Sequence, residues 1–206
     1  MVSNAPSAKN LRSEKTRNAL LSAGFDLLAD RPIDAIPIDD VVATAGVAKG
    51  SFFNHFDDKS GFAQAIAAEV RAEVEAMVNA ANEGLTDPIA RLAGGMRVAA
   101  RFAGDHPRRA IVMLRGLDGS TLRDHPLNHG LRADIEAAVN AGLLRPEAAP
   151  SGMLFWLGLC QIVMVNSIER AASGKAARER LAQMLVMGLT GLGVDQARAE
   201  EESRRA

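Results

Sequence analysis

The segment 38–59, IDDVVATAGVAKGSFFNHFDDK, constrains the fold more than any other part of the chain. Its apolar residues from Ile38 to Ala45 recur three and four positions apart, as they do along one side of a short helix. Gly46 follows, and glycine enters the left-handed conformation that often ends a helix without a steric penalty. A new helix is then expected from about Ala48. The segment therefore predicts two short helices joined by a tight turn.

The second of these helices has two different sides. Phe52 and Phe56 lie four residues apart and share one side, which we expect to be buried. The other side carries small polar and basic residues, namely Lys49, Ser51, Asn54 and His55. A short helix that is held by its apolar side and offers such side chains on the other is what reading the major groove of DNA requires.

The run from Ala45 to Phe56, AGVAKGSFFNHF, followed by Lys59, resembles the helix-turn-helix signature of the TetR family of bacterial transcriptional regulators. The segment from Thr16 to Leu28 is similar to the first helix of the DNA-binding domain of that family, so the resemblance covers about the first third of the chain. It implies an N-terminal arm and a three-helix DNA-binding domain in residues 1–60. The residues expected to contact DNA are Arg17, Lys49, Gly50, Ser51, Phe53, Asn54, His55 and Lys59.

Three positions depart from the pattern of the family. The family usually caps both short helices with Ser or Thr, whereas this chain has Pro37 and Ala48, and the missing cap at Ala48 costs roughly 1 kcal/mol. Phe53 stands where the family usually has Tyr, so it can offer only apolar contact to a sugar or a thymine methyl. The sequence Lys49-Gly50-Ser51 lacks the spacing and the preceding strand of a P-loop, and nucleotide binding is not expected there.

Charge does not by itself favour a nucleic-acid binder. The formal net charge is -1, and segment 1–60 is also at -1, with seven Lys and Arg against eight Asp and Glu. Many such binders carry a strong basic excess, so the distribution of charge must supply the binding face here. The basic residues cluster in the arm and around the reading helix, while most acids lie between Asp26 and Asp40. We therefore expect a basic face opposite an acidic one.

The composition favours helix throughout the 206 residues, with 48% hydrophobic residues, 4% aromatic residues and no Tyr. An all-α protein is expected, with residues 61–206 forming a helical ligand-binding and dimerisation domain. An arm at 1–12 and a first helix at about 13–30 precede the helix-turn-helix, and 195–206 is expected to be frayed. The apolar spacing and the Gly and Pro breaks predict further helices at about 62–81, 88–103, 107–117, 128–141, 151–172 and 175–191.

The last two of these helices are apolar almost all round, so each must be buried on two sides. One side can pack in its own domain while the other meets a second copy about a two-fold axis. In the resembled family these helices form the dimer, and two glycines would permit close crossing there. The predicted dimer residues are Phe155, Leu159, Ile162, Met184, Met187, Gly188 and Gly191.

The helices from 88 to 141 and one face of the 151–172 helix would enclose a ligand pocket, as the family usually has. The predicted lining residues are Met96, Arg97, Phe102, Met113, Leu117, Trp156, Cys160, Gln161 and Met164. Methionine and aromatic residues at helical spacing are also common in an ordinary core, so that reading stays open. No cofactor and no metal is expected, because His125, His129 and Asp124 surround Pro126 in a loop that does not favour a metal site.

These patterns predict a ligand-responsive DNA-binding regulator, most simply a repressor that a small molecule releases from a palindromic double-stranded DNA operator. The alternative is a helical small-molecule-binding or adaptor dimer that no longer binds DNA specifically. An enzyme is not expected, because GxSxG, HExxH and Rossmann glycine motifs are missing and Cys160 lies in an apolar stretch. A cytoplasmic location without a membrane span is expected from the single cysteine and the missing leader pattern.

Overall fold

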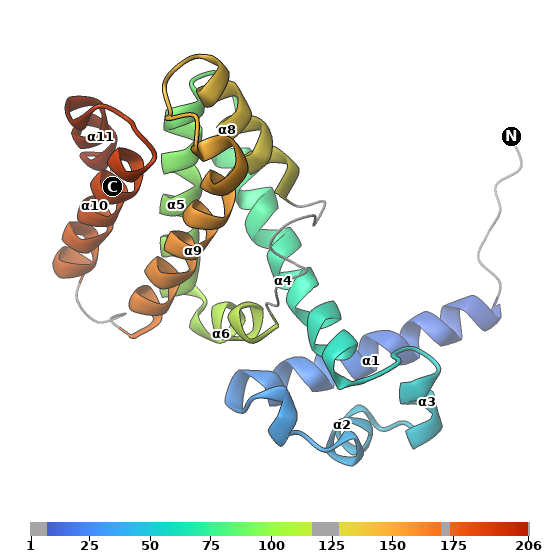
Figure 1. The fold of residues 1–206 in the computed structure, drawn as a ribbon. Helices are drawn as coiled ribbons and strands as arrows, with labels where there is room; N and C mark the ends of the chain where they lie inside the picture. The colour runs from blue at the N-terminus through green and yellow to red at the C-terminus, as the bar shows by residue number, and fades with distance from the viewer. Residues whose placement is uncertain (1–7, 117–127, 170–173, 206) are drawn as a thin grey trace, which may run out of the picture. The chain divides into compact units, whose positions relative to one another are not determined.

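The computed structural model describes residues 8–116, 128–169 and 174–205 of the chain, and these residues form helices and no strand (Figure 1). The expected all-α fold is therefore confirmed. Two compact units can be separated. The first runs up to Glu69 and also takes Ile111–Gly116, and the second takes Val70–Ala110 and the described residues after Gly116.

The first unit contains the helix-turn-helix. Its elements are α1 (Ala8–Asp30), the 3-10 helix η1 (Ile33–Ala35), α2 (Ile38–Ala45), α3 (Lys49–Phe53), the first part of α4 (Lys59–Ala81) and the end of α6 (Pro107–Arg115). Leu20 and Leu28 of α1 are fully buried with Phe52 and Phe62. The ring centroids of Phe52 and Phe62 lie 5.1 Å apart with the rings edge to face, a favourable geometry for aromatic pairs.

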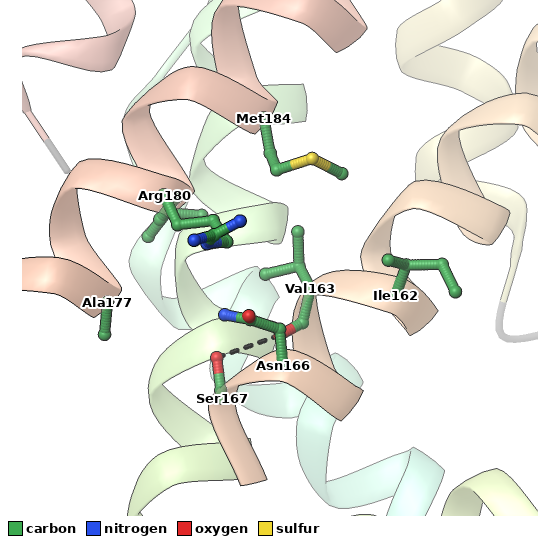
Figure 2. Close-up of a pocket in the computed structure, with 8 residues that line it drawn as sticks. Ile162, Val163, Asn166, Ser167, Ala177, Arg180 and Met184 are labelled. Atoms are coloured by element: carbon green, nitrogen blue, oxygen red, sulfur yellow. Dashed lines mark hydrogen bonds between the residues drawn. The ribbon is translucent and has the colours of Figure 1, made fainter. Parts of the chain in front are cut away.

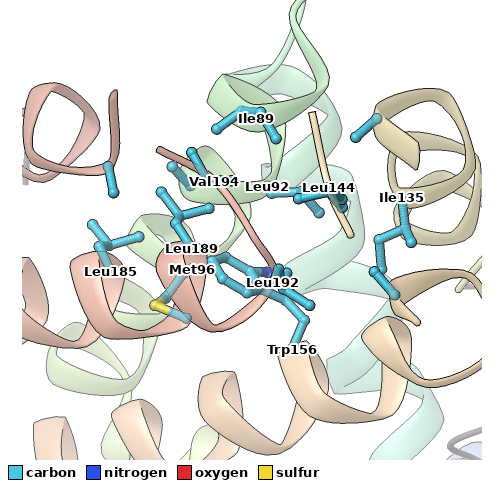
Figure 3. Packing of buried hydrophobic residues seen from close by; sticks show 14 of the residues in the cluster. Ile89, Leu92, Met96, Ile135, Leu144, Trp156, Leu185, Leu189, Leu192 and Val194 are labelled. Carbon is cyan, nitrogen blue, oxygen red and sulfur yellow. The ribbon is translucent and has the colours of Figure 1, made fainter. Parts of the chain in front are cut away.

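The second unit is a helical bundle. It contains the rest of α4 and α6 with α5 (Pro88–Asp105), α8 (His129–Asn140), α9 (Ala148–Glu169), α10 (Gly174–Gly191) and α11 (Gln196–Ser203). Helix α5 packs against α8, α9 and α10, and α10 also packs against α9 and α11. Figure 3 shows Trp156 of α9 at the centre of the apolar core, next to Leu192 and close to Met96 and Leu189.

Local signals start several helices of the second unit. The Asp87 carboxylate accepts a hydrogen bond of 3.0 Å from the Ile89 N–H, and Pro88 occupies the first helical position of α5, where its missing N–H costs nothing. The Asp195 carboxylate caps α11 in the same way, at 2.9 Å from the Ala197 N–H. Both caps are of the kind that a sequence can reveal.

Two expected boundaries differ from the structure. Helix α1 begins at Ala8 and not near residue 13, so residues 8–12 are helical. The C-terminal segment expected to fray forms α11, in which Ala199 and Glu202 are fully buried. A contact that is distant in sequence helps to hold it, because Arg97 of α5 lies 3.7 Å from the Glu202 carboxylate, to which Arg198 and Arg205 add local ion pairs.

Candidate functional site

The turn between α2 and α3 fixes the position of the reading helix. Gly46 has φ 66° and ψ 34°, the left-handed conformation predicted for it. The Gly46 N–H donates to the Ala43 carbonyl at 3.2 Å, and the Val47 N–H donates to the Val42 carbonyl at 3.0 Å. The chain thus leaves α2 at a defined angle and enters α3, which begins at Lys49 without any side-chain cap from Ala48.

Helix α3 has the two sides that the sequence predicts. Phe52 is fully buried among the other phenylalanines, whereas Phe53 is 54% exposed. The remaining predicted contact residues of this helix and its C-terminal end are exposed or half-buried: Lys49, Gly50, Ser51, Asn54 and His55. Because no atom lies within 4 Å of the position a Gly50 Cβ would take, another molecule can approach the backbone closely there.

Acidic and basic groups are less separated on this unit than the sequence suggests. The Lys49 ammonium lies 2.8 Å from an Asp39 carboxylate oxygen, and both side chains are exposed. Asp39 is in the first turn of α2, so its charge is next to the start of the reading helix. The expectation of an acidic face opposite a basic one is therefore wrong for Asp39.

Arg17 lies on the surface of the same unit, beside the aromatic cluster. Its guanidinium carbon is 5.7 Å from the centre of the Phe56 ring, and one of its nitrogens is 3.9 Å from a Glu69 carboxylate oxygen. A guanidinium over an aromatic face is held by the ring quadrupole. Arg17 is thus oriented by its own unit while its side chain remains partly exposed.

Lys59 has a role that the sequence did not predict. Its ammonium group donates hydrogen bonds to the carbonyls of Ile33 and Asp34 at 3.2 Å and to that of Ile36 at 3.1 Å. An ammonium group has three N–H donors, so these three bonds use all of them. Lys59 therefore holds η1 and the entry into α2 in place, and in this conformation it has no N–H left for a phosphate.

The predicted ligand residues do not gather around one cavity. Met96 and Trp156 are in the apolar core, with Cys160 packed against it, and Met164 is also buried. The Arg97 guanidinium contacts Glu202, and Phe102 is buried beside His106, with ring centroids 5.4 Å apart. Gln161 is half-buried, Met113 belongs to the first unit, and Leu117 lies outside the described residues.

The predicted dimer residues have mixed positions. Ile162 and Met187 are 60% and 66% exposed, and Phe155 is also exposed, whereas Leu159 and Met184 are half-buried. The two glycines lie against side chains of α9, and Gly188 is buried whereas Gly191 is exposed. A Cβ on Gly188 would lie 3.0 Å from the Trp156 ring, and one on Gly191 would lie 3.0 Å from the Phe155 ring. They allow α10 to pack closely on α9 of the same chain. Their predicted role in a close crossing between two copies stays a prediction.

A hollow of about 190 Å³ lies between α9 and α10 (Figure 2). Its wall is partly apolar, and Arg180 and Met184 of α10 project toward Val163 and Asn166 of α9. The Ser167 hydroxyl donates to the Val163 carbonyl at 2.9 Å, so it is already used within α9. Two of the predicted dimer residues, Ile162 and Met184, line this hollow, and none of the predicted ligand residues does.

A polar group in the second unit was missed from the sequence. It consists of Arg71 and Glu75 of α4, Asn128 before α8 and Cys160 of α9. Arg71 is 9% exposed and its guanidinium donates to the Asn128 side-chain oxygen. The signal available in the sequence was a charged pair one turn apart, next to the apolar stripe of α4.

Helix α9 is the one described helix that is long and apolar enough to cross a membrane, judged by length and composition. Its Trp156, Val163 and Met164 are buried in the second unit, so it is a core helix. Among the described residues no group of His, Cys, Asp and Glu is arranged to hold a metal ion. Of the three residues considered as metal ligands from the sequence, Asp124 and His125 lie outside the described part of the chain.

Comparison with known proteins assigns the first unit to a family. Residues 20–66 match the family of bacterial regulatory proteins called the tetR family. The chain is 36% identical over 52 residues to the uncharacterized HTH-type transcriptional regulator YwcC of Bacillus subtilis, a match that covers 25% of this chain and 23% of YwcC. It is 28% identical over 75 residues to the HTH-type transcriptional repressor DhaR of Mycobacterium sp., covering 36% of this chain and 38% of DhaR. The matches thus span well under half the length of either relative.

The fold similarity extends over nearly the whole chain. The crystal structure of RolR in complex with resorcinol superposes with a TM-score of 0.60 and 21% sequence identity, covering 96% of this chain and 97% of RolR. At that identity the likeness concerns the fold. Both units, and not only the helix-turn-helix, therefore have counterparts in a protein of known structure.

Proposed function

Because this chain belongs to the TetR family of bacterial transcriptional regulators, we propose that it is a repressor that binds a double-stranded DNA operator as a homodimer and is released by a small molecule. The observation that carries the proposal is the arrangement of α3, with Phe52 buried and its opposite side exposed. The family consists of regulators and not of enzymes, as expected from the sequence.

Helix α3 is proposed to enter the major groove. Ser51 and Asn54 can hydrogen-bond base edges, and Phe53 can contact a thymine methyl. Lys49 is proposed to contact a phosphate. To do so it breaks its exposed ion pair with Asp39. An exposed ion pair is worth little, about 0–1 kcal/mol, so this exchange has a small cost. Arg17 adds a second cation, and Lys59 contributes by positioning α2.

Helices α9 and α10 are proposed to form the dimer interface. Ile162, Val165 and Met187 are large apolar side chains that remain exposed on these two helices. Exposed apolar side chains on neighbouring helices favour association, because a second copy removes them from water. The hollow beside Ile162 and Met184 offers space for side chains of that copy. A two-fold axis would then place the two α3 helices about 34–36 Å apart or a multiple of that, which implies a palindromic operator.

The second unit is proposed to hold the small-molecule effector, with Trp156, Cys160 and Met164 as contact residues on α9. These three residues are spaced by four and so share one side of the helix. The RolR complex supports the proposal, because a protein of this fold is known to take up the small aromatic molecule resorcinol. The effector of this chain is proposed to be similarly small.

Release is proposed to occur by a shift between two conformations. Helices α4 and α6 each continue from one unit into the other. In the first unit the Arg115 guanidinium at the end of α6 donates to the Leu28 carbonyl, and Gly116 packs on Ala67. An effector that prefers a conformer with a tilted α4 would place the two reading helices at the wrong separation. Operator affinity would fall by the differential affinity of the effector for the two conformers.

A DNA-binding assay tests the core of the proposal. The purified protein should prefer a duplex from its own upstream region over a random duplex at moderate salt, and equal binding to both would end the proposal of specific recognition. Changing Asn54 to Ala should alter which sequence is preferred, whereas changing Lys49 to Met should weaken binding to every sequence. If both variants acted alike, the division of roles on α3 would be wrong.

The dimer is tested by sedimentation equilibrium. Changing Ile162 to Asp should give a monomer and abolish operator binding, because a charge would be buried at the interface. Changing Leu143, which is exposed in the loop after α8, to Asp should leave the dimer intact. A dimer that survives the Ile162 change would place the interface elsewhere.

A second candidate function is a helical small-molecule-binding or adaptor dimer that does not bind DNA specifically. The uncapped start of α3 at Ala48 and the pairing of Lys49 with Asp39 favour it. Salt dependence separates the two functions, since a DNA binder loses affinity steeply as salt rises, because the counterions that it releases from the phosphates gain less entropy in a more concentrated salt solution. Either function is proposed to operate in the cytoplasm.

A further inference from the structure

The interior of the second unit contains a charged side chain in an unusual place. Arg71 of α4 is 9% exposed, and its guanidinium donates to the side-chain oxygen of Asn128, which is 1% exposed. Asn128 occupies the N-cap position of α8, where asparagine commonly caps the helix, yet its side chain makes no cap hydrogen bond. The Asn128 amide is thus directed to Arg71 in place of its own helix.

Glu75 lies one turn after Arg71 on α4, so both project from the same side of the helix. Burial raises the pKa of Glu75, and the charge of Arg71 counteracts this effect. Burial also lowers the pKa of Arg71, and Glu75 counteracts it. The Glu75 charge further contributes to the raised pKa of Cys160 on α9, after burial of the thiol. Helices α4 and α9 and the start of α8 therefore bring a cation, an acid, an amide and a thiol together.

This polar group is costly for the fold. Arg71 is buried and Glu75 is half-buried. Taking ionisable groups out of water costs free energy, and replacing a buried ion pair with apolar side chains is often neutral or stabilising. The bundle already has an apolar core around Trp156 that contains neither residue. Buried groups whose pKa values are displaced occur frequently at functional sites.

We propose that Arg71, Glu75 and Asn128, with Cys160 of α9, form the hydrogen-bonding part of the effector site, and that the effector is an uncharged molecule bearing hydroxyl groups, such as a phenol or an alcohol. The inference rests on the proposed function, because it names the ligand class for the same effector site. A hydroxyl group donates to the Glu75 carboxylate while its oxygen accepts from Arg71 in place of Asn128.

The charges of the site select the class of effector. Arg71 and Glu75 together are neutral, so an uncharged molecule binds without leaving a net charge in the interior. A carboxylate would attract Arg71 and meet the negative charge of Glu75, and an ammonium would meet Arg71. The two residues also lie on α4, the helix that continues into the first unit, so an effector bound here acts directly on that helix.

Binding of three probes to the full-length protein tests the class. Resorcinol is uncharged at pH 7, benzoate is an anion and benzylammonium is a cation, and all three are aromatic molecules of similar size. Trp156 is the single tryptophan and lies four residues before Cys160, so its fluorescence reports on this side of α9. Resorcinol should change the fluorescence saturably, with an affinity at least tenfold above those of benzoate and benzylammonium. Stronger binding of either ion, or no binding of resorcinol, would overturn the inference.

Two variants on the same helix test the residues. Glu75→Gln should weaken resorcinol binding roughly tenfold or more, because a hydrogen bond to a charged acceptor is lost. Glu73→Gln is the matched control, since Glu73 is partly exposed and pairs with Arg109. The affinity of this variant for resorcinol should not change. Equal effects of the two substitutions would show that Glu75 does not contact the effector. If a variant does not fold, the comparison of the three probes on the unchanged protein still tests the inference.

Operator binding without any probe is measured on the same preparation. A protein that binds its operator and responds to some molecule, but not through Glu75, leaves the proposed function intact and overturns the site. A protein that binds resorcinol through Glu75 but does not recognise DNA supports the site and overturns the proposed function. The two proposals can therefore fail separately.

Discussion

The ammonium group of Lys59 lies 3.1 Å from the carbonyl oxygen of Ile36, at the point where the chain enters α2. Two more carbonyls, those of Ile33 and Asp34, accept from the same group. The first residue of α4 thus fixes the end of η1, and through it the start of the helix-turn-helix. A lysine that the sequence assigned to DNA acts first on the architecture of the DNA-binding unit.

Replacing Lys59 with Met should lower the free energy of unfolding by about 1–3 kcal/mol, because three carbonyls lose a charged donor. Urea unfolding measures this change. The slope of log affinity against log salt for operator DNA should stay the same, since Lys59 makes no phosphate contact in this conformation. Lys49→Met is the control and should do the reverse, with unchanged stability and a slope reduced by about 1. A reduced slope for the Lys59 variant would show that Lys59 does contact a DNA phosphate.

Two neighbouring phenylalanines, Phe52 and Phe53, are predicted to have different roles, one in stability and the other in DNA recognition. Phe52 is fully buried, 5.1 Å from Phe62 and 5.6 Å from Phe56 between ring centroids, while Phe53 is exposed. Phe52→Ala should lower the free energy of unfolding by about 3–5 kcal/mol, because a large cavity is left in the core of the first unit. Phe53→Ala should change stability little and reduce operator affinity. Thermal unfolding and a DNA-binding titration of both variants check this, and similar destabilisation by both would contradict the two-sided α3.

Sequence was sufficient for the features that depend on neighbours in the chain. Gly46 ends α2 because of its own backbone freedom, and Asp87 with Pro88 starts α5, so both could be predicted. The exposure of Asn54 followed from helical spacing relative to Phe52. By contrast, the partners of Lys59 are 23 to 26 residues away in the chain. No periodic pattern contains that information.

The close packing of α10 on α9 gives a prediction for Gly188. A Cβ at this position would lie 2.9 Å from Leu159 Cδ1 and 3.0 Å from Trp156 Cζ3. Gly188→Ala should therefore lower the free energy of unfolding by about 1–3 kcal/mol, since a tightly packed core must move. Gly104→Ala in α5 is the control, because a Cβ there would meet nothing within 4 Å, and it should gain up to about 1 kcal/mol. A neutral Gly188→Ala would show that the two helices separate easily.

Cys160 should be an unreactive thiol. Burial, with the charge of Glu75, raises its pKa from 9.0 to about 12, and the thiolate is the reactive form. Alkylation by N-ethylmaleimide at pH 8 should be about a thousandfold slower in the folded protein than in urea, where the thiol has its ordinary pKa. Mass spectrometry of timed samples measures the two rates. The folded state holds this proton more tightly, so stability should fall as the pH rises from 9 toward 12 and should not depend on Cys160 below that range. Rates within a few-fold of each other would show an accessible thiolate.

The candidate effector site shows why a pattern of apolar residues is not enough. Trp156, Cys160 and Met164 were expected from their spacing on α9, and they do share a side of that helix. Arg71 and Glu75 were not expected, because charged residues on a helix usually face water. The burial of Arg71 and the half-buried position of Glu75 result from packing around α4, together with the contact from Arg71 to Asn128, 57 residues away.

Helix α11 depends on the carboxylate of Glu202, which is fully buried. One of its oxygens lies 3.7 Å from Arg97 of α5, and the other lies 3.0 Å from Arg205 and 3.6 Å from Arg198. Glu202→Gln should lower the free energy of unfolding by about 3 kcal/mol, because Arg97 loses its charged partner while it stays mostly buried. Glu201→Gln is the matched control, since Glu201 is half-exposed and its ion pair with Arg205 is worth less than about 1 kcal/mol. Urea unfolding of the two variants compares their free energies of unfolding. Equal values would show that the buried carboxylate of Glu202 is not needed to hold α11 in place.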